Sequence, residues 1–95
     1  MPNYENYYSV EHLKEEMSSS IQQQRLKEMA ALCEGTVLDV GAGIGELETF
    51  LDKSQTLAVD IKTDYVAYME NQGIYTKAAD AESLPFPDKS FDTVV

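Results

Sequence analysis

Residues 41–45 read Gly-Ala-Gly-Ile-Gly and follow directly on a short apolar segment that carries one carboxylate, Asp39. The three glycines of this loop are Gly41, Gly43 and Gly45. Glycine accepts positive φ angles and lets the backbone approach a ligand closely. A loop that joins a strand to the start of a helix also presents unpaired backbone N–H groups. The pattern indicates a nucleoside-binding loop, and a tight strand-to-helix turn without a ligand is the alternative.

The residues around the glycines limit the class of ligand. A dinucleotide-binding loop has glycine at the sixth position counted from Gly41, where this chain has Glu46. A carboxylate at that position opposes a pyrophosphate at the helix N-terminus. No Gly-Lys-Ser/Thr follows, so the loop is not a P-loop. Together with the negative charge of Asp39, this favours a ligand with cationic groups and argues against a nicotinamide-dependent oxidoreductase.

Two further carboxylates end the next two predicted strands. Asp60 can accept hydrogen bonds from both hydroxyls of a ribose, or it can face solvent or cap the following helix. Ile61 can pack against a purine ring, in the core, or both. At the end of the third strand, Asp80 and the Ala81 N–H offer an acceptor and a donor for the edge of adenine. The alternative for Asp80 is a cap of the loop that follows it.

The elements that must position these residues alternate between strand and helix from residue 36 onward. Apolar runs predict strands at 36–40, 56–61, 74–79 and 91–95. Helices are predicted at 46–53 and 63–72, the second capped by Thr63 and ended by Gly73. This order predicts an α/β fold, a Rossmann-like, doubly wound parallel sheet of which about four strands are present.

The first 35 residues are expected to form a separate helical segment ahead of the sheet. Ser9 is the predicted N-cap of a first helix, and residues 18–20 cap a second one. The apolar stripe of the second helix consists of Leu26, Met29, Ala30 and Cys33. Gly35 is predicted to follow that helix as its left-handed end residue.

Three residue types in this segment have weaker functional claims. Tyrosines at positions 4, 7 and 8 either contribute to a lid over the site or belong to a loose terminus. His12, the only histidine, either acts as a base or faces solvent or a neighbouring helix, and we favour the second. Cys33 is expected in the core.

Composition excludes several classes of function. The net charge is −10, with 17 acidic and 7 basic residues, so we expect neither a nucleic-acid nor a membrane partner. The sequence shows no apolar run of about 20 residues and no signal peptide, and its single cysteine forms no internal disulfide framework. A cytoplasmic location is therefore expected. The acidic residues lack the spacing of metal ligands.

Three segments together resemble one family. They are Val-Leu-Asp-Val-Gly-Ala-Gly-Ile-Gly at 37–45, Ala-Val-Asp-Ile at 58–61, and Ala-Asp-Ala-Glu-Ser-Leu-Pro-Phe-Pro-Asp-Lys-Ser-Phe-Asp at 79–92. Over residues 36–95 the chain resembles the N-terminal half of the class I S-adenosylmethionine-dependent methyltransferases. The resemblance is closest to the small-molecule branch that includes the ubiquinone- and menaquinone-biosynthesis type.

The resemblance implies S-adenosyl-L-methionine as the cofactor, whose sulfonium and ammonium groups fit the cationic ligand expected from charge. It also implies a role for each candidate residue. The methionine part is assigned to Asp39, Gly41, Ala42, Gly43 and Gly45, the ribose to Asp60, and the adenine to Ile61, Asp80 and Ala81. Asp92 is structural by the same resemblance.

The expected activity is methyl transfer to a small-molecule acceptor, largely by alignment of the two reactants. Catalytic residues of the family follow the fourth strand, so none is assigned here, and the 95-residue chain alone is expected to be inactive. The last strand, 91–95, has no features of a protected edge, so self-association is expected there unless further chain covers it. A non-catalytic nucleoside-binding or interaction module remains the alternative.

Overall fold

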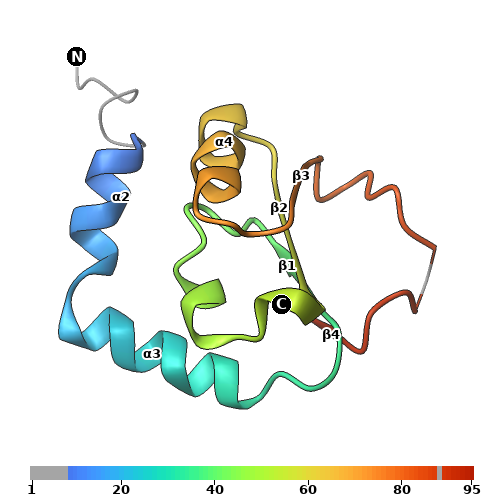
Figure 1. The fold of residues 1–95 in the computed structure, drawn as a ribbon, viewed down its shortest axis with the longest axis horizontal. Helices are drawn as coiled ribbons and strands as arrows, with labels where there is room; N and C mark the ends of the chain where they lie inside the picture. Colours follow the sequence, from blue (N-terminus) through green and yellow to red (C-terminus); the bar gives the residue numbers. More distant parts are fainter. Residues whose placement is uncertain (1–8, 88) are drawn as a thin grey trace.

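Four parallel strands form one sheet at the centre of the protein, in the order β3-β2-β1-β4 (Figure 1). The computed structural model describes residues 9–87 and 89–95, so the lid prediction for Tyr4, Tyr7 and Tyr8 lies outside it. The strands are β1 (Val37–Val40), β2 (Thr56–Asp60), β3 (Thr76–Ala78) and β4 (Thr93–Val94). This arrangement confirms the predicted Rossmann-like α/β fold. The third and fourth strands are shorter than the sequence predicts.

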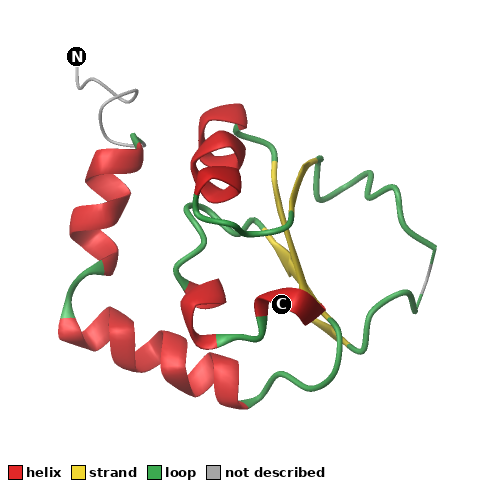
Figure 2. Cartoon of the chain, in the orientation of Figure 1, coloured by secondary structure: helices red, strands yellow, loops and turns green. Residues whose placement is uncertain are grey.

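Three α-helices and two short 3-10 turns accompany the sheet in the described part of the chain (Figure 2). They are α2 (Val10–Met17), α3 (Ser20–Ala31), α4 (Thr63–Asn71), η1 (Leu47–Phe50) and η2 (Lys53–Gln55). Helix α4 packs on the face of the sheet that carries Ala58, where Met69 and Ile74 complete the buried core. None of these helices is both long and apolar enough to cross a membrane.

The N-terminal helices begin where the sequence predicts. The Ser9 hydroxyl accepts a hydrogen bond from His12 N at 3.2 Å, and the Ser19 hydroxyl accepts one from Gln22 N at 3.2 Å. The predicted stripe of α3 is wrong in part, because only Leu26 is buried and Met29 is 41% exposed. Cys33 is half-buried and follows the end of the helix, so its predicted place in the core is also wrong. The reason is that α3 rests on the sheet layer mainly through η1, so a narrow contact replaces a broad buried face.

Gly35 does not end helix α3 in the predicted way. The helix stops at Ala31 with Leu32 as its C-cap, and Gly35 lies in the turn before β1 with φ +64°. A Cβ on Gly35 would overlap the Asp92 carboxylate. This glycine therefore allows β4 to reach the start of β1.

The helix predicted at 46–53 is also wrong. Leu51 is extended, and the Asp52 side chain accepts from Ser54 N at 3.0 Å, which ends η1 and starts η2. Local side-chain-to-backbone bonds of this kind compete with helix. At the next helix, Lys62 rather than Thr63 is the N-cap, and no side-chain cap bond forms there. Gly73 follows α4 with φ +78°, as predicted.

Candidate functional site

The glycine loop leaves the carboxyl end of β1 and is fastened to β2. The backbone N–H groups of Gly41 and Ala42 both donate to Val59 O, at 2.8 and 3.0 Å. All three glycines have positive φ, +70° at Gly41, +64° at Gly43 and +83° at Gly45. L-residues with a Cβ rarely adopt this conformation, so the sequence pattern and the backbone agree.

The space around the three glycines differs. A Cβ on Gly41 would meet nothing within 4 Å, and one on Gly43 would meet only Leu13 Cδ1 at 4.0 Å. A Cβ on Gly45 would lie 2.6 Å from Ile74 Cδ1. Gly41 and Gly43 thus leave an open cradle, whereas Gly45 lets the loop pack on the core. The alternate spacing in the sequence could not separate these roles.

Asp60 ties the cradle to the end of β2. Its Oδ2 accepts from Gly43 N and its Oδ1 accepts from Lys62 N, both at 2.9 Å. The residue is 9% exposed. Each carboxylate oxygen can accept a second bond, so two acceptor positions remain for hydroxyl groups of a ligand. Ile61 beside it is 65% exposed, which places it at the surface rather than in the core.

Asp39 lies on the same face of the sheet as Asp60, because it pairs with Ala58 two residues before the end of β2. It is 6% exposed. Burial raises the pKa of Asp39, and the negative charge of Asp60 raises it further, against a hydrogen bond with Glu48 that lowers it. The structure therefore brings Asp39, Asp60 and the open glycines together at one edge of the sheet.

Glu48 is a buried acid that the sequence did not single out. It is 0% exposed, and neither side-chain oxygen has a hydrogen-bond donor among the residues that the structure describes. Burial, followed by the hydrogen bond with Asp39 and the charge of Asp39, raises the pKa of Glu48 to about 9. Nothing local marks Glu48, because its burial follows from the packing of η1 against β1 and α3.

Asp80 and Ala81 stand apart from this group. Both are exposed, after the end of β3. Asp80 Oδ1 accepts from Glu82 N at 2.9 Å, and Ser83 N donates to Asp80 O at 3.0 Å, so the turn foreseen as the alternative is present. One carboxylate oxygen carries no bond in that turn. Contact with an adenine edge stays a prediction.

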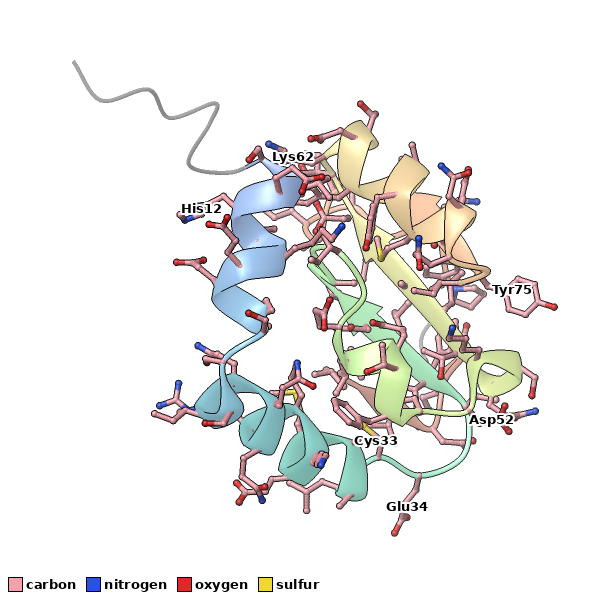
Figure 3. All side chains as sticks on the ribbon, turned by 60° about the vertical axis from the view of Figure 1, so that its left-hand side comes forward. His12, Cys33, Glu34, Asp52, Lys62 and Tyr75 are labelled. Carbon is pink, nitrogen blue, oxygen red and sulfur yellow. The ribbon has the colours of Figure 1, made fainter. Side chains whose placement is uncertain are left out.

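Helix α2 lies over the open side of the glycine loop. Leu13 and Met17 face Gly41, Gly43 and Glu46 across a cavity of about 170 Å³. His12 points outward from the helix (Figure 3), with Nε2 3.6 Å from Glu16 Oε1. The described residues include no group of three His, Cys, Asp or Glu side chains that could hold a metal ion. The cavity wall is therefore largely apolar, with Glu46 as the one acidic residue among its lining residues.

Comparison with solved structures places this fold among known ones. A protein of Pyrococcus horikoshii OT3, PH0226, superposes with a TM-score of 0.68 at 21% identity, over 99% of this chain and 50% of its own. A putative methyltransferase from Bacillus halodurans C-125 gives 0.55 at 29% identity, over 79% and 37%. SpnF, a (4+2)-cyclase, gives 0.59 at 25% identity, over 76% and 31%. The chain thus spans between about a third and a half of each of these proteins.

The parallel sheet and the glycine loop that follows β1 together make up a Rossmann-like methyltransferase fold. Residues 37–95 match the family described as "Methyltransferase domain". The chain belongs to this family. No curated protein matches it significantly.

Proposed function

We propose that this chain binds S-adenosyl-L-methionine and forms the donor-binding part of an enzyme that methylates a small molecule. The branch that includes ubiquinone- and menaquinone-biosynthesis methyltransferases is the best candidate by sequence resemblance. The observation that carries the proposal is the Asp60 junction. One buried carboxylate holds Gly43 N and Lys62 N and keeps two acceptor positions beside an open cradle.

The residues fit the donor in three ways. The open faces of Gly41 and Gly43 give room that a Cβ would fill. Two buried carboxyl groups, Asp39 and Asp60, favour a cation over a phosphate. The exposed Ile61 offers an apolar surface directly beside the proposed ribose position.

When bound, the donor supplies an activated methyl group on its sulfonium. The task of this chain is to fix the donor in position: Asp60 accepts from the ribose, Ile61 lies against the adenine, and the glycine loop contacts the methionine part. Most of the rate enhancement then comes from alignment with the acceptor. No general base is assigned to any residue of this chain.

Calorimetric titration with S-adenosylhomocysteine and with NAD tests the proposal. We expect binding of S-adenosylhomocysteine and no heat from NAD, because Glu46 stands where a pyrophosphate would lie. Binding of NAD without S-adenosylhomocysteine would overturn the proposal.

A second candidate follows from SpnF, which has the same fold and is a cyclase. In that case the cradle holds the nucleoside without methyl transfer. Incubation of the whole enzyme, of which this chain would form the donor-binding part, with labelled donor and a small-molecule extract separates the two. Labelled product favours methyl transfer, whereas donor that is bound and recovered intact favours a binding role.

A further inference from the structure

Among the buried acids of the residues that the structure describes, Glu48 alone has no part in the proposed donor contacts. Its side chain is completely buried in η1, and both oxygens lack a hydrogen-bond donor among residues 9–87 and 89–95. A buried carboxylate without a donor is strongly disfavoured, so such a group holds a proton or gains a partner. Its neighbour Asp39 is also an acceptor when ionised, so a hydrogen bond between them requires a proton on one of the two.

The charged and titratable groups around this pair are few. From β2, Asp60 acts on Asp39 through its negative charge. After helix α3 comes the Cys33 thiol, whose pKa is raised by burial and then by Asp39 and Glu48. The Lys27 ammonium of α3 lies 5.8 Å from the centre of the Phe50 ring, at the end of η1. The net field at the pair is negative, and a bound cation would lower its energy.

We propose that Glu48 is a positioning residue for the cationic donor: its carboxyl proton is donated to Asp39, and a sulfonium bound at the open glycines repels that proton, which is released to solvent. This inference rests on the proposed function. Asp39 is the carboxyl group on β1, next to the cradle. Glu48 influences a bound cation through its hydrogen bond with Asp39. The pair therefore carries one negative charge in the free protein and moves toward two when the cation binds.

The consequence is a pH-dependent preference for sulfonium over thioether. With its proton, the pair is the weaker cation site, and without it the pair is the stronger one. The sulfonium lowers the pKa of the pair, so the preference rises as pH increases toward 9. S-adenosylmethionine and S-adenosylhomocysteine are matched probes, because they share the amino-acid and nucleoside parts and differ in the charge at sulfur.

The test measures Kd for both ligands at pH 6.5 and 8.5 by calorimetry. We expect the affinity ratio, sulfonium over thioether, to rise about threefold or more in the natural chain, since a one-unit fall in a pKa near 9 has that effect. In Glu48→Gln the side-chain amide still donates to Asp39 but cannot lose a proton, so the ratio should not change with pH. Glu70→Gln, on the exposed side of α4, makes the same chemical substitution away from the pair and should behave like the natural chain.

The possible outcomes separate the role of Glu48 from the proposed function. A flat ratio in the natural chain, or an equal rise in Glu48→Gln, overturns the role of Glu48 while the proposed function stands. Failure of both ligands to bind overturns both proposals. A purely structural role would change both affinities equally and independently of pH.

Infrared spectroscopy gives a readout without ligand. A band of a protonated carboxyl should be present in the natural chain at pH 7 and absent from Glu48→Gln. Its presence at equal strength in both proteins would contradict the assignment of the proton to this pair.

Discussion

The carboxyl groups at the two ends of the sheet have opposite surroundings. At the amino end, Asp92 Oδ2 accepts from Thr36 N at 2.8 Å and Thr36 Oγ1 at 3.1 Å, and hydrogen bonds lower the pKa of Asp92. Ser54 likewise lowers the pKa of Asp52. Asp52 and Glu34 lie at one end of the molecule and Lys62 at the other (Figure 3).

At the carboxyl end, burial raises the pKa of both Asp39 and Glu48. Asp92 uses its donors to join β4 to the start of β1. Beyond the glycine loop, Glu48 has no donor among the described residues, and Asp60 receives two donors but keeps two acceptor positions beside the open cradle. A buried carboxyl group that keeps acceptor positions unused is therefore a better guide to a ligand site than an exposed one whose bonds only join strands.

The largest effect is expected for Asp60→Ala, which removes the bonds to Gly43 N and Lys62 N together with the proposed ribose acceptor. We expect about a 100-fold weaker Kd for S-adenosylhomocysteine, or about 2.7 kcal/mol. Asp60→Asn keeps the shape and one acceptor and should lose less. Calorimetry on folded protein checks both, and unchanged affinity in Asp60→Ala would remove its ribose role.

The next effect is on stability and concerns Glu48→Gln. Because the folded-state pKa of Glu48 is about 9, above its usual 4.5, the proton stabilises the fold below pH 4.5. That stabilisation is lost as pH rises toward 9. Removing the ionisable group should raise stability by about 2 kcal/mol at pH 7 and flatten the profile between pH 4.5 and 9. Urea unfolding at several pH values measures this, with Glu70→Gln as the control.

Two glycines, one before β1 at the amino end of the sheet and one after it at the carboxyl end, should respond differently to substitution by alanine. Gly35→Ala would push against Asp92 and should cost about 2 kcal/mol of stability while the affinity of the folded protein stays the same. Gly41→Ala has free space around its Cβ, so only φ strain of about 1 kcal/mol is expected. Its affinity for S-adenosylhomocysteine should nevertheless fall tenfold or more. A loss of affinity in Gly35→Ala with unchanged affinity in Gly41→Ala would contradict the placement of the ligand site at the carboxyl end of the sheet.

The smallest effect is expected for Asp92→Asn, at an exposed position. Its lowered pKa contributes stability above the usual 3.8 that is lost as pH falls through the folded value. The variant should therefore be slightly less stable at pH 7 and less sensitive to acid. Thermal unfolding between pH 2.5 and 7 tests this, and an unchanged acid limb would show that the Thr36 bonds do not favour the ionised form.

The fold was predictable because strand and helix signals alternate strongly and locally. The glycine loop and Asp60 were also predictable, since their spacing is set by one strand–loop–helix unit. Glu48 was not, because its burial depends on the approach of η1 to β1. The different roles of Gly41 and Gly45 depend on where Ile74 lies, which sequence spacing does not encode.

The strand order has a consequence for synthesis on the ribosome. β1 pairs with β2 early, but its other edge is filled only by β4, through bonds between residues 56 positions apart such as Thr36 N to Asp92. Of the two central strands, β1 is thus completed only after β3 and β4 have emerged. Until residue 93 is available, β1 is itself an edge that can pair with a wrong partner.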